Sequence, residues 1–287
     1  MTGEIPKFRN IGEKLIFILF FALAGTLIIV VFSPWDPPLN AKKDYLGRLA
    51  TILFFAVLYL LKHKITVLEK YHQVVFGLLV LITAVTLDWV FGIYLIKQLG
   101  VRVTSPANIA LVKLNELVIV AAVIIACTLA SGKRLVEIYL HKGRLRLGLV
   151  IGAVCFVVFV AGGIPMATSW FQGRDLSVSR VIPWIPWVLI FVFANSTLEE
   201  LMFRGLFLRK LEPFLGKFLS NLTIALVFTL IHYGVTYAAD QVFFLLILFP
   251  LALLLGWLAQ KTGALWASIL LHAGMDIPVI LGIFSNL

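Results

Sequence analysis

Long runs of apolar residues alternate along the chain with short polar connections. Within each run the apolar residues are continuous. They do not alternate with polar ones at every second position, as in a strand with one exposed face. Only helices and closed barrels satisfy all their backbone hydrogen bonds inside a bilayer, and a helix needs about 20 apolar residues to cross one. The pattern therefore predicts membrane-spanning helices.

These runs predict nine helical segments. Their bounds are Leu15–Phe32, Leu46–Leu61, Val74–Ile96, Ile109–Ala130, Leu147–Gly163, Ile182–Leu208, Phe218–Tyr237, Val242–Ala259 and Ala264–Phe284. The second segment is short, and we expect Arg48 at its end to extend its charged group to the membrane interface. The expected fold is an all-α, polytopic transmembrane bundle of 8–9 helices.

The composition supports the same fold class. Of 287 residues, 61% are hydrophobic and 13% are charged, whereas soluble domains have about 25% charged residues. The net charge of +10 comes from Lys and Arg that cluster in the short connections. In that position they favour contacts with anionic lipid head groups over contacts with nucleic acid. We therefore expect a multi-pass protein of the cell membrane that has no nucleic-acid partner.

The distribution of Lys and Arg predicts the orientation of the helices. Of the 24 such residues, fifteen lie on the side that holds the N-terminus, seven lie on the opposite side, and Lys113 and Arg204 lie within segments. Short cytoplasmic connections carry the excess of positive charge in membrane proteins. We therefore predict a cytoplasmic N-terminus.

Several ionisable residues lie inside the predicted spans, where they are costly and mark function by default. They are Asp88, Lys113, Glu116, Glu199, Glu200, Arg204, His232, His272 and Asp276. We interpret Asp88 and the pair of Lys113 and Glu116 as structural. Measured from the cytoplasmic ends of their segments, Glu200, His232 and His272 lie about 15, 21 and 12 Å deep at 1.5 Å per residue. These similar depths predict that the three side chains meet in a buried cavity that faces the cytoplasm.

The spacing within the sixth segment separates two roles. Glu200 and Arg204 are four residues apart, so they share a helix face and can form an ion pair. Pairing would neutralise both charges inside the membrane. Glu199 points about 100° away from Glu200 on a helix of 3.6 residues per turn. We therefore expect Glu199 to face the cavity.

The same spacing recurs in two other segments. Phe228 and His232 are four residues apart, which places an aromatic ring beside an imidazole. His272 and Asp276 are also four residues apart, and this spacing suits a carboxylate that orients a histidine.

Three stretches of the sequence together resemble the motifs of the CPBP intramembrane proteases, which include CAAX proteases and bacteriocin-processing enzymes. They are E-E-L-M-F-R at 199–204, F-T-L-I-H at 228–232 and W-A-S-I-L-L-H-A-G-M-D at 266–276. The resemblance covers roughly Ile182–Phe284. It implies a division into divergent N-terminal helices at 1–181 and a catalytic helical core at 182–287.

The resemblance implies a role for each motif residue. Glu199 would be the general base that activates a water molecule, and His232 would share that task. His272 and the residue at position 276 would stabilise the oxyanion. Better-studied CAAX proteases have Asn where this chain has Asp276, and this difference puts the oxyanion role of position 276 in question. Glu200 and Arg204 would form a structural ion pair, and Phe228 would line the substrate pocket.

The expected function is an intramembrane endopeptidase that cleaves a membrane-associated protein or peptide, with a prenylated CAAX protein as one option. A zinc ion held by Glu199, His232 and His272 is an alternative, since His₂Glu is a known ligand set. We favour a metal-free mechanism in which glutamate and histidine activate water. The alternative functions are a proton-coupled transporter and a non-catalytic membrane scaffold or immunity protein.

Overall fold

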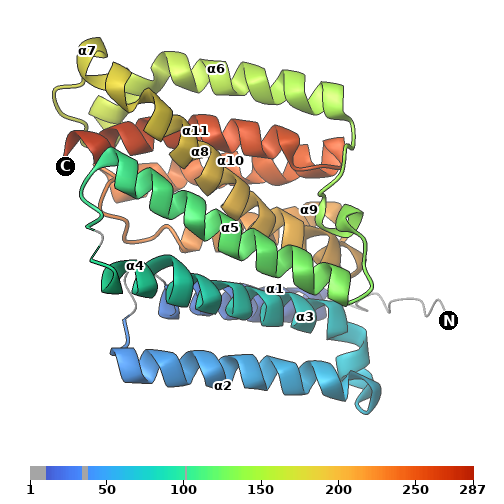
Figure 1. The fold of residues 1–287 in the computed structure, drawn as a ribbon. Coiled ribbons are helices and arrows are strands. Elements are labelled where there is room, and N and C mark those ends of the chain that lie inside the picture. The colour runs from blue at the N-terminus through green and yellow to red at the C-terminus, as the bar shows by residue number, and fades with distance from the viewer. Residues whose placement is uncertain (1–10, 34–37, 101) are drawn as a thin grey trace.

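The computed structural model describes residues 11–33, 38–100 and 102–287. Lys7 and Arg9, which contribute to the charge bias, lie outside these ranges. All regular elements in the described ranges are helical, and eight helical stretches are long and apolar enough to cross a membrane. Figure 1 shows them as a bundle whose helices run mostly along one direction. The expected all-α, polytopic fold is confirmed.

The first half of the chain forms five of these stretches, of which the third contains a π-helical turn. Their bounds are α1 (Ile11–Val31), α2 (Ala41–Leu60) with the turn η1 (Leu61–His63), α3 (Thr66–Leu87) continuing through π-helical η2 (Asp88–Tyr94) into α4 (Leu95–Gln98), α5 (Pro106–Ala130), and α6 (Leu145–Trp170). A short 3₁₀ turn, η3 (Leu135–Ile138), lies between α5 and α6.

The second half begins with a short turn and contains the three motifs. Its elements are α7 (Val178–Val181), η4 (Ile182–Trp184), α8 (Ile185–Glu200), π-helical η5 (Leu201–Leu208), α9 (Arg209–Leu230), α10 (Gln241–Thr262) and α11 (Trp266–Ser285). Consecutive helical elements run from Val178 to Leu230, a stretch of 53 residues. At 1.5 Å per residue it would measure about 80 Å, far more than the 30 Å of a bilayer core. Gly216 interrupts the stretch, with φ 75° and ψ 172°. The stretch therefore contains both the sixth and the seventh predicted segments.

The structure corrects the predicted end of the seventh segment. We expected helix to Tyr237, but α9 ends at Leu230, and His232 lies in the turn that follows. Nδ1 of His232 is 2.7 Å from the carbonyl oxygen of Phe228, one of the last carbonyls of the helix, which have no partner within it. The sequence around this point is apolar on both sides, so hydropathy could not locate the end.

The expectation for Arg48 is wrong. Its side chain is fully buried by other residues and does not extend its charged group to the surface of the bundle. The helix begins earlier than predicted, at Ala41, and thus includes Asp44, whose carboxylate lies 3.0 Å from Nε of Arg48. The guanidinium also donates to the carbonyl of Val85 at 3.1 Å and lies over the ring of Trp89. A buried pair and an aromatic face therefore hold this charge inside the bundle.

Helix α11 lies inside the bundle, with most of its residues buried, and packs closely against α6. Glycines make this approach possible, as small residues commonly do between membrane helices. A Cβ atom at Gly274 of α11 would lie 3.0 Å from Cα of Phe156 in α6. A Cβ atom at Gly152 of α6 would lie 2.7 Å from Cβ of Leu270. Side chains at these two positions would push the helices apart.

The helices alternate in direction and give the bundle two ends. We call the end that holds the start of α1 and the connection 131–144 the first end. The second end holds the connections 171–177 and 231–240 and the C-terminus. In Figure 1 the first end is on the right and the second on the left. These ends would face opposite sides of a membrane.

Candidate active site

A cavity of about 410 Å³ lies among α5, α6, α8, α10 and α11. Its walls are mainly apolar and aromatic, and a smaller set of polar side chains faces it. The polar and charged lining residues are Lys113, Asn195, Glu199, His232, Tyr237, Asp240, His272 and Asp276. An apolar pocket with a few convergent polar groups is the usual form of a binding or catalytic site.

Glu200 and Arg204 form an ion pair behind this cavity. Nη1 of Arg204 lies 2.7 Å from Oε1 of Glu200, and both side chains are fully buried. The guanidinium also donates through Nη2 to the carbonyl of Ala252 at 3.1 Å and lies 4.6 Å from the centre of the Phe228 ring. Arg204 belongs to η5, and π-helical turns of this kind are common at functional sites.

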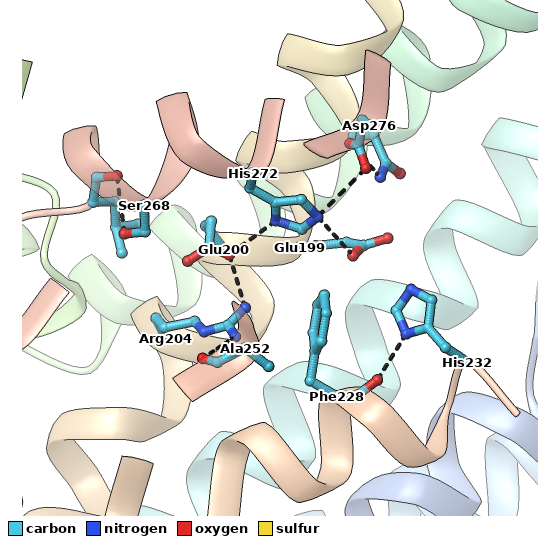
Figure 2. Close-up of polar contacts among 11 residues, drawn as sticks. Glu199, Glu200, Arg204, Phe228, His232, Ala252, Ser268, His272 and Asp276 are labelled. Carbon is cyan, nitrogen blue, oxygen red and sulfur yellow. Dashed lines mark hydrogen bonds and ion pairs between the residues drawn. The ribbon is translucent and has the colours of Figure 1, made fainter. Parts of the chain in front are cut away.

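Glu200 also contacts His272, which the sequence did not predict. Nδ1 of His272 lies 2.9 Å from the same Oε1 atom that binds Arg204, and Figure 2 shows Glu200 between the two side chains. The spacing in the sequence suited Asp276 as a residue that orients His272, but its Oδ1 is 3.7 Å from Nε2, too far for a hydrogen bond. Because Glu200 occupies the Nδ1 side, Nε2 of His272 points toward Glu199 and Asp276.

Glu199 turns away from Glu200 and lines the cavity, in the position expected from the helical spacing. Its Oε2 atom lies 3.6 Å from Nε2 of His272. This oxygen is buried and has no hydrogen-bond partner among the described residues. A buried carboxylate oxygen without a donor is costly unless a water molecule or a ligand occupies the site. The unpaired oxygen therefore marks a position where a water molecule or a polar group of a ligand can bind.

Phe228 lies between the two histidines. The centre of its ring is 4.7 Å from that of His232 and 5.5 Å from that of His272, as Figure 2 shows. Since Nδ1 of His232 contacts the carbonyl of Phe228, this nitrogen acts as the donor, and Nε2 is left as an acceptor in the neutral ring. His232 thus lines the cavity with a nitrogen that can accept a proton.

Asp276 accepts a hydrogen bond from Asn195, a residue that the sequence analysis missed. Nδ2 of Asn195 lies 3.0 Å from Oδ2 of Asp276. Asn195 belongs to α8 and lies one helical turn before Glu199, so both side chains are on the same face. The sequence contained one signal for Asn195, namely an amide side chain inside an apolar run, four residues before Glu199.

Residues 181–278 match the family model for Rce1-like proteins, described as type II CAAX prenyl endopeptidase Rce1-like. This segment is Rce1-like. We call it the Rce1-like region, and it contains all three motifs together with Asn195. At the level of the family, the match supports a CAAX-type intramembrane protease, and the apolar helices support a multi-pass membrane protein. No curated protein and no solved structure matches the chain.

Helices outside the Rce1-like region complete the cavity. Lys113 from α5, and Trp170 and Phe171 from the end of α6, line its wall. We interpreted Lys113 and Glu116 as structural. Their ion pair is present, with a distance of 2.6 Å between Nζ and Oε2, but Lys113 also borders the cavity. The N-terminal helices therefore contribute directly to the surface that a substrate would meet.

The cavity extends toward the second end of the bundle. Trp170, Phe171, Tyr237 and Asp240 line it there, whereas no described residue of the connection 131–144 does. We expected it to face the same side as the N-terminus, and this expectation is wrong. The depths of Glu200, His232 and His272 along their helices indicated that these residues could meet. They did not indicate at which end of the bundle the shared cavity would open.

The geometry does not favour the zinc alternative. Among the described residues, no three His, Cys, Asp or Glu side chains are grouped closely enough to hold a metal ion. The Phe228 ring lies between His272 and His232. Glu199, His232 and His272 surround one space without forming a ligand set.

Proposed function

We propose that this protein is an intramembrane endopeptidase of the cell membrane that hydrolyses a peptide bond in a membrane-associated protein or peptide by a metal-free mechanism. The observation that carries this proposal is the orphaned Oε2 atom of Glu199, 3.6 Å from His272 in an apolar cavity. A water molecule placed there would have a proton acceptor on one side and space for a substrate carbonyl on the other. The match of the Rce1-like region supports the same reaction class.

Glu199 and His232 act on the attacking water in this proposal. The carboxylate of Glu199 accepts a proton as the water oxygen bonds to the carbonyl carbon. His232 faces the same cavity with an acceptor nitrogen and shares in positioning and deprotonating the water. Glu199 then returns the proton to the leaving nitrogen as the C–N bond breaks. One water is consumed, and a carboxylic acid and an amine are produced.

His272 faces the negative charge that develops on the carbonyl oxygen. Its Nδ1–H is held by Glu200, so an Nε2–H donor is present only when the ring carries both protons. Glu199, Glu200 and Asp276, with oxygens at 2.9–3.7 Å, are suitable partners for such a cation. Fixed donors of this kind stabilise the transition state without reorganising during the reaction.

The test is hydrolysis of a defined peptide by the full-length protein in detergent micelles. The probe is an internally quenched peptide with a farnesylated cysteine and a CAAX ending, and mass spectrometry locates the cleaved bond. We expect cleavage by the wild type and complete loss in Glu199→Gln, since the amide cannot accept the proton. Glu137→Gln is the matched control, because the side chain of Glu137 is partly exposed and does not line the cavity.

The probe without the prenyl group separates the substrate class from the reaction. Cleavage of both peptides would support the protease and remove the prenyl requirement. If Glu199→Gln cleaves the probe as fast as wild type, Glu199 is not the base and the proposed mechanism is wrong.

A further inference from the structure

The proposed reaction creates an oxyanion in a cavity rich in carboxylates. Glu199 and Asp276 line the cavity, and Glu200 lies directly behind His272. An ionised carboxylate repels a developing negative charge and has no proton to donate. In addition to His272, the site therefore needs another N–H donor that faces the reacting carbonyl.

Asn195 has the required chemistry and position. It lines the cavity from α8, one turn before Glu199. Because an ionised carboxylate only accepts hydrogen bonds, the contact with Asp276 at 3.0 Å fixes the NH₂ end of the amide, and not its oxygen, on this side. The NH₂ group has two hydrogens. One points to Asp276, and the second has no acceptor among the described residues.

We infer that Asn195 is a catalytic residue whose free amide N–H donates to the oxyanion, and that Asp276 is the positioning residue that holds the amide in place. This inference rests on the proposed function. It also gives Asp276 a role that suits a carboxylate, because Asp276 accepts a hydrogen bond from Asn195 and does not have to donate one to the oxyanion.

The two donors, Asn195 and His272, come from different helices and lie beside the same carboxylate, that of Asp276. Oδ2 of Asp276 binds the amide of Asn195 at 3.0 Å, and its Oδ1 lies 3.7 Å from Nε2 of His272. The N–H groups of Asn195 and His272 therefore flank the same carboxylate. Glu199 lies 3.6 Å from His272, so a carbonyl attacked by a water on Glu199 lies near both donors.

The deciding experiment measures kcat and KM of the full-length protein on the quenched farnesylated peptide for Asn195→Ala and Asn195→Asp. Loss of one oxyanion donor should lower kcat about 100-fold, with KM and the thermal midpoint unchanged. Asn195→Asp keeps the size of the side chain but replaces the donor with an acceptor, so it should be at least as slow. Asn115→Ala is the matched control, since it removes an amide of α5 that, among the described residues, donates a hydrogen bond to the Phe91 carbonyl alone.

A second variant separates donation from a structural role. Adding Asp276→Asn to Asn195→Ala restores an amide close to the lost one, and kcat should recover most of its loss. A purely structural Asn195 would show no such recovery. An unchanged kcat in Asn195→Ala, or a rise in KM alone, would overturn the inference while leaving the proposed function intact. A wild-type protein that cleaves no peptide would overturn both together.

Discussion

Replacing Glu200 with leucine should destabilise the protein more than replacing Arg204 with leucine. Glu200→Leu leaves the buried guanidinium of Arg204 with the carbonyl of Ala252 and the face of Phe228 as its remaining partners. Arg204→Leu leaves the carboxylate of Glu200 with His272 at 2.9 Å, a partner that can carry positive charge. The carboxylate therefore retains a partner in direct contact, whereas the guanidinium retains only the weaker electrostatic attraction of Glu199.

The expected magnitude follows from the burial of the pair. Breaking a fully buried ion pair by removing one partner costs about 3–5 kcal/mol, and both side chains here are fully buried. We expect Glu200→Leu near the upper limit of this range and Arg204→Leu near or below the lower one. Replacing both partners with leucine removes both charges from the membrane, so the double variant should be more stable than Glu200→Leu.

The assay is the free energy of unfolding in detergent for the two single variants and the double variant, arranged as a double-mutant cycle. Lys133 and Glu137 provide the matched control pair, because they are also four residues apart but partly exposed, at 3.5 Å. Removing either of them should cost no more than about 1 kcal/mol. Additive losses at Glu200 and Arg204, or losses equal to those of the control pair, would refute the reasoning.

The same double variant separates stability from activity. Leucine at position 200 removes the acceptor that fixes Nδ1 of His272. The double variant should therefore fold and still fail to cleave the peptide. A stable and fully active double variant would show that the site does not need Glu200 to orient His272.

Three further predictions concern the cavity and its chemistry. Dialysis against a zinc chelator should leave the rate of cleavage unchanged, because the described residues contain no metal ligand set; a loss restored by added zinc would contradict the metal-free mechanism. Asp276→Asn should retain activity, since the new amide still offers an oxygen to Asn195, whereas Asp276→Leu should lower kcat. In intact cells without the native cysteines, an impermeant maleimide should label Asp240→Cys and not Lys142→Cys, which lie at opposite ends of the bundle. The reverse result would place the N-terminus outside.

Local spacing in the sequence was enough to predict two contacts between residues that are four apart in the chain. The period of 3.6 residues placed Glu200 beside Arg204 and Phe228 beside His232, and both contacts are present. Apolar runs of bilayer length likewise predicted the all-α fold and most of its helices. The end of α9 escaped prediction because a turn held by His232 interrupts a continuous apolar run.

Contacts between helices required the tertiary structure. Glu200 binds His272 across 72 residues of sequence, and Asn195 binds Asp276 across 81. Such contacts depend on how closely α8 and α11 approach, on their relative rotation and on their relative shift along the axis. No pattern within one helix encodes these quantities. The sequence therefore pointed to the candidate catalytic residues, while packing decided which carboxylate contacts His272, which amide accompanies Asp276 and at which end the cavity opens.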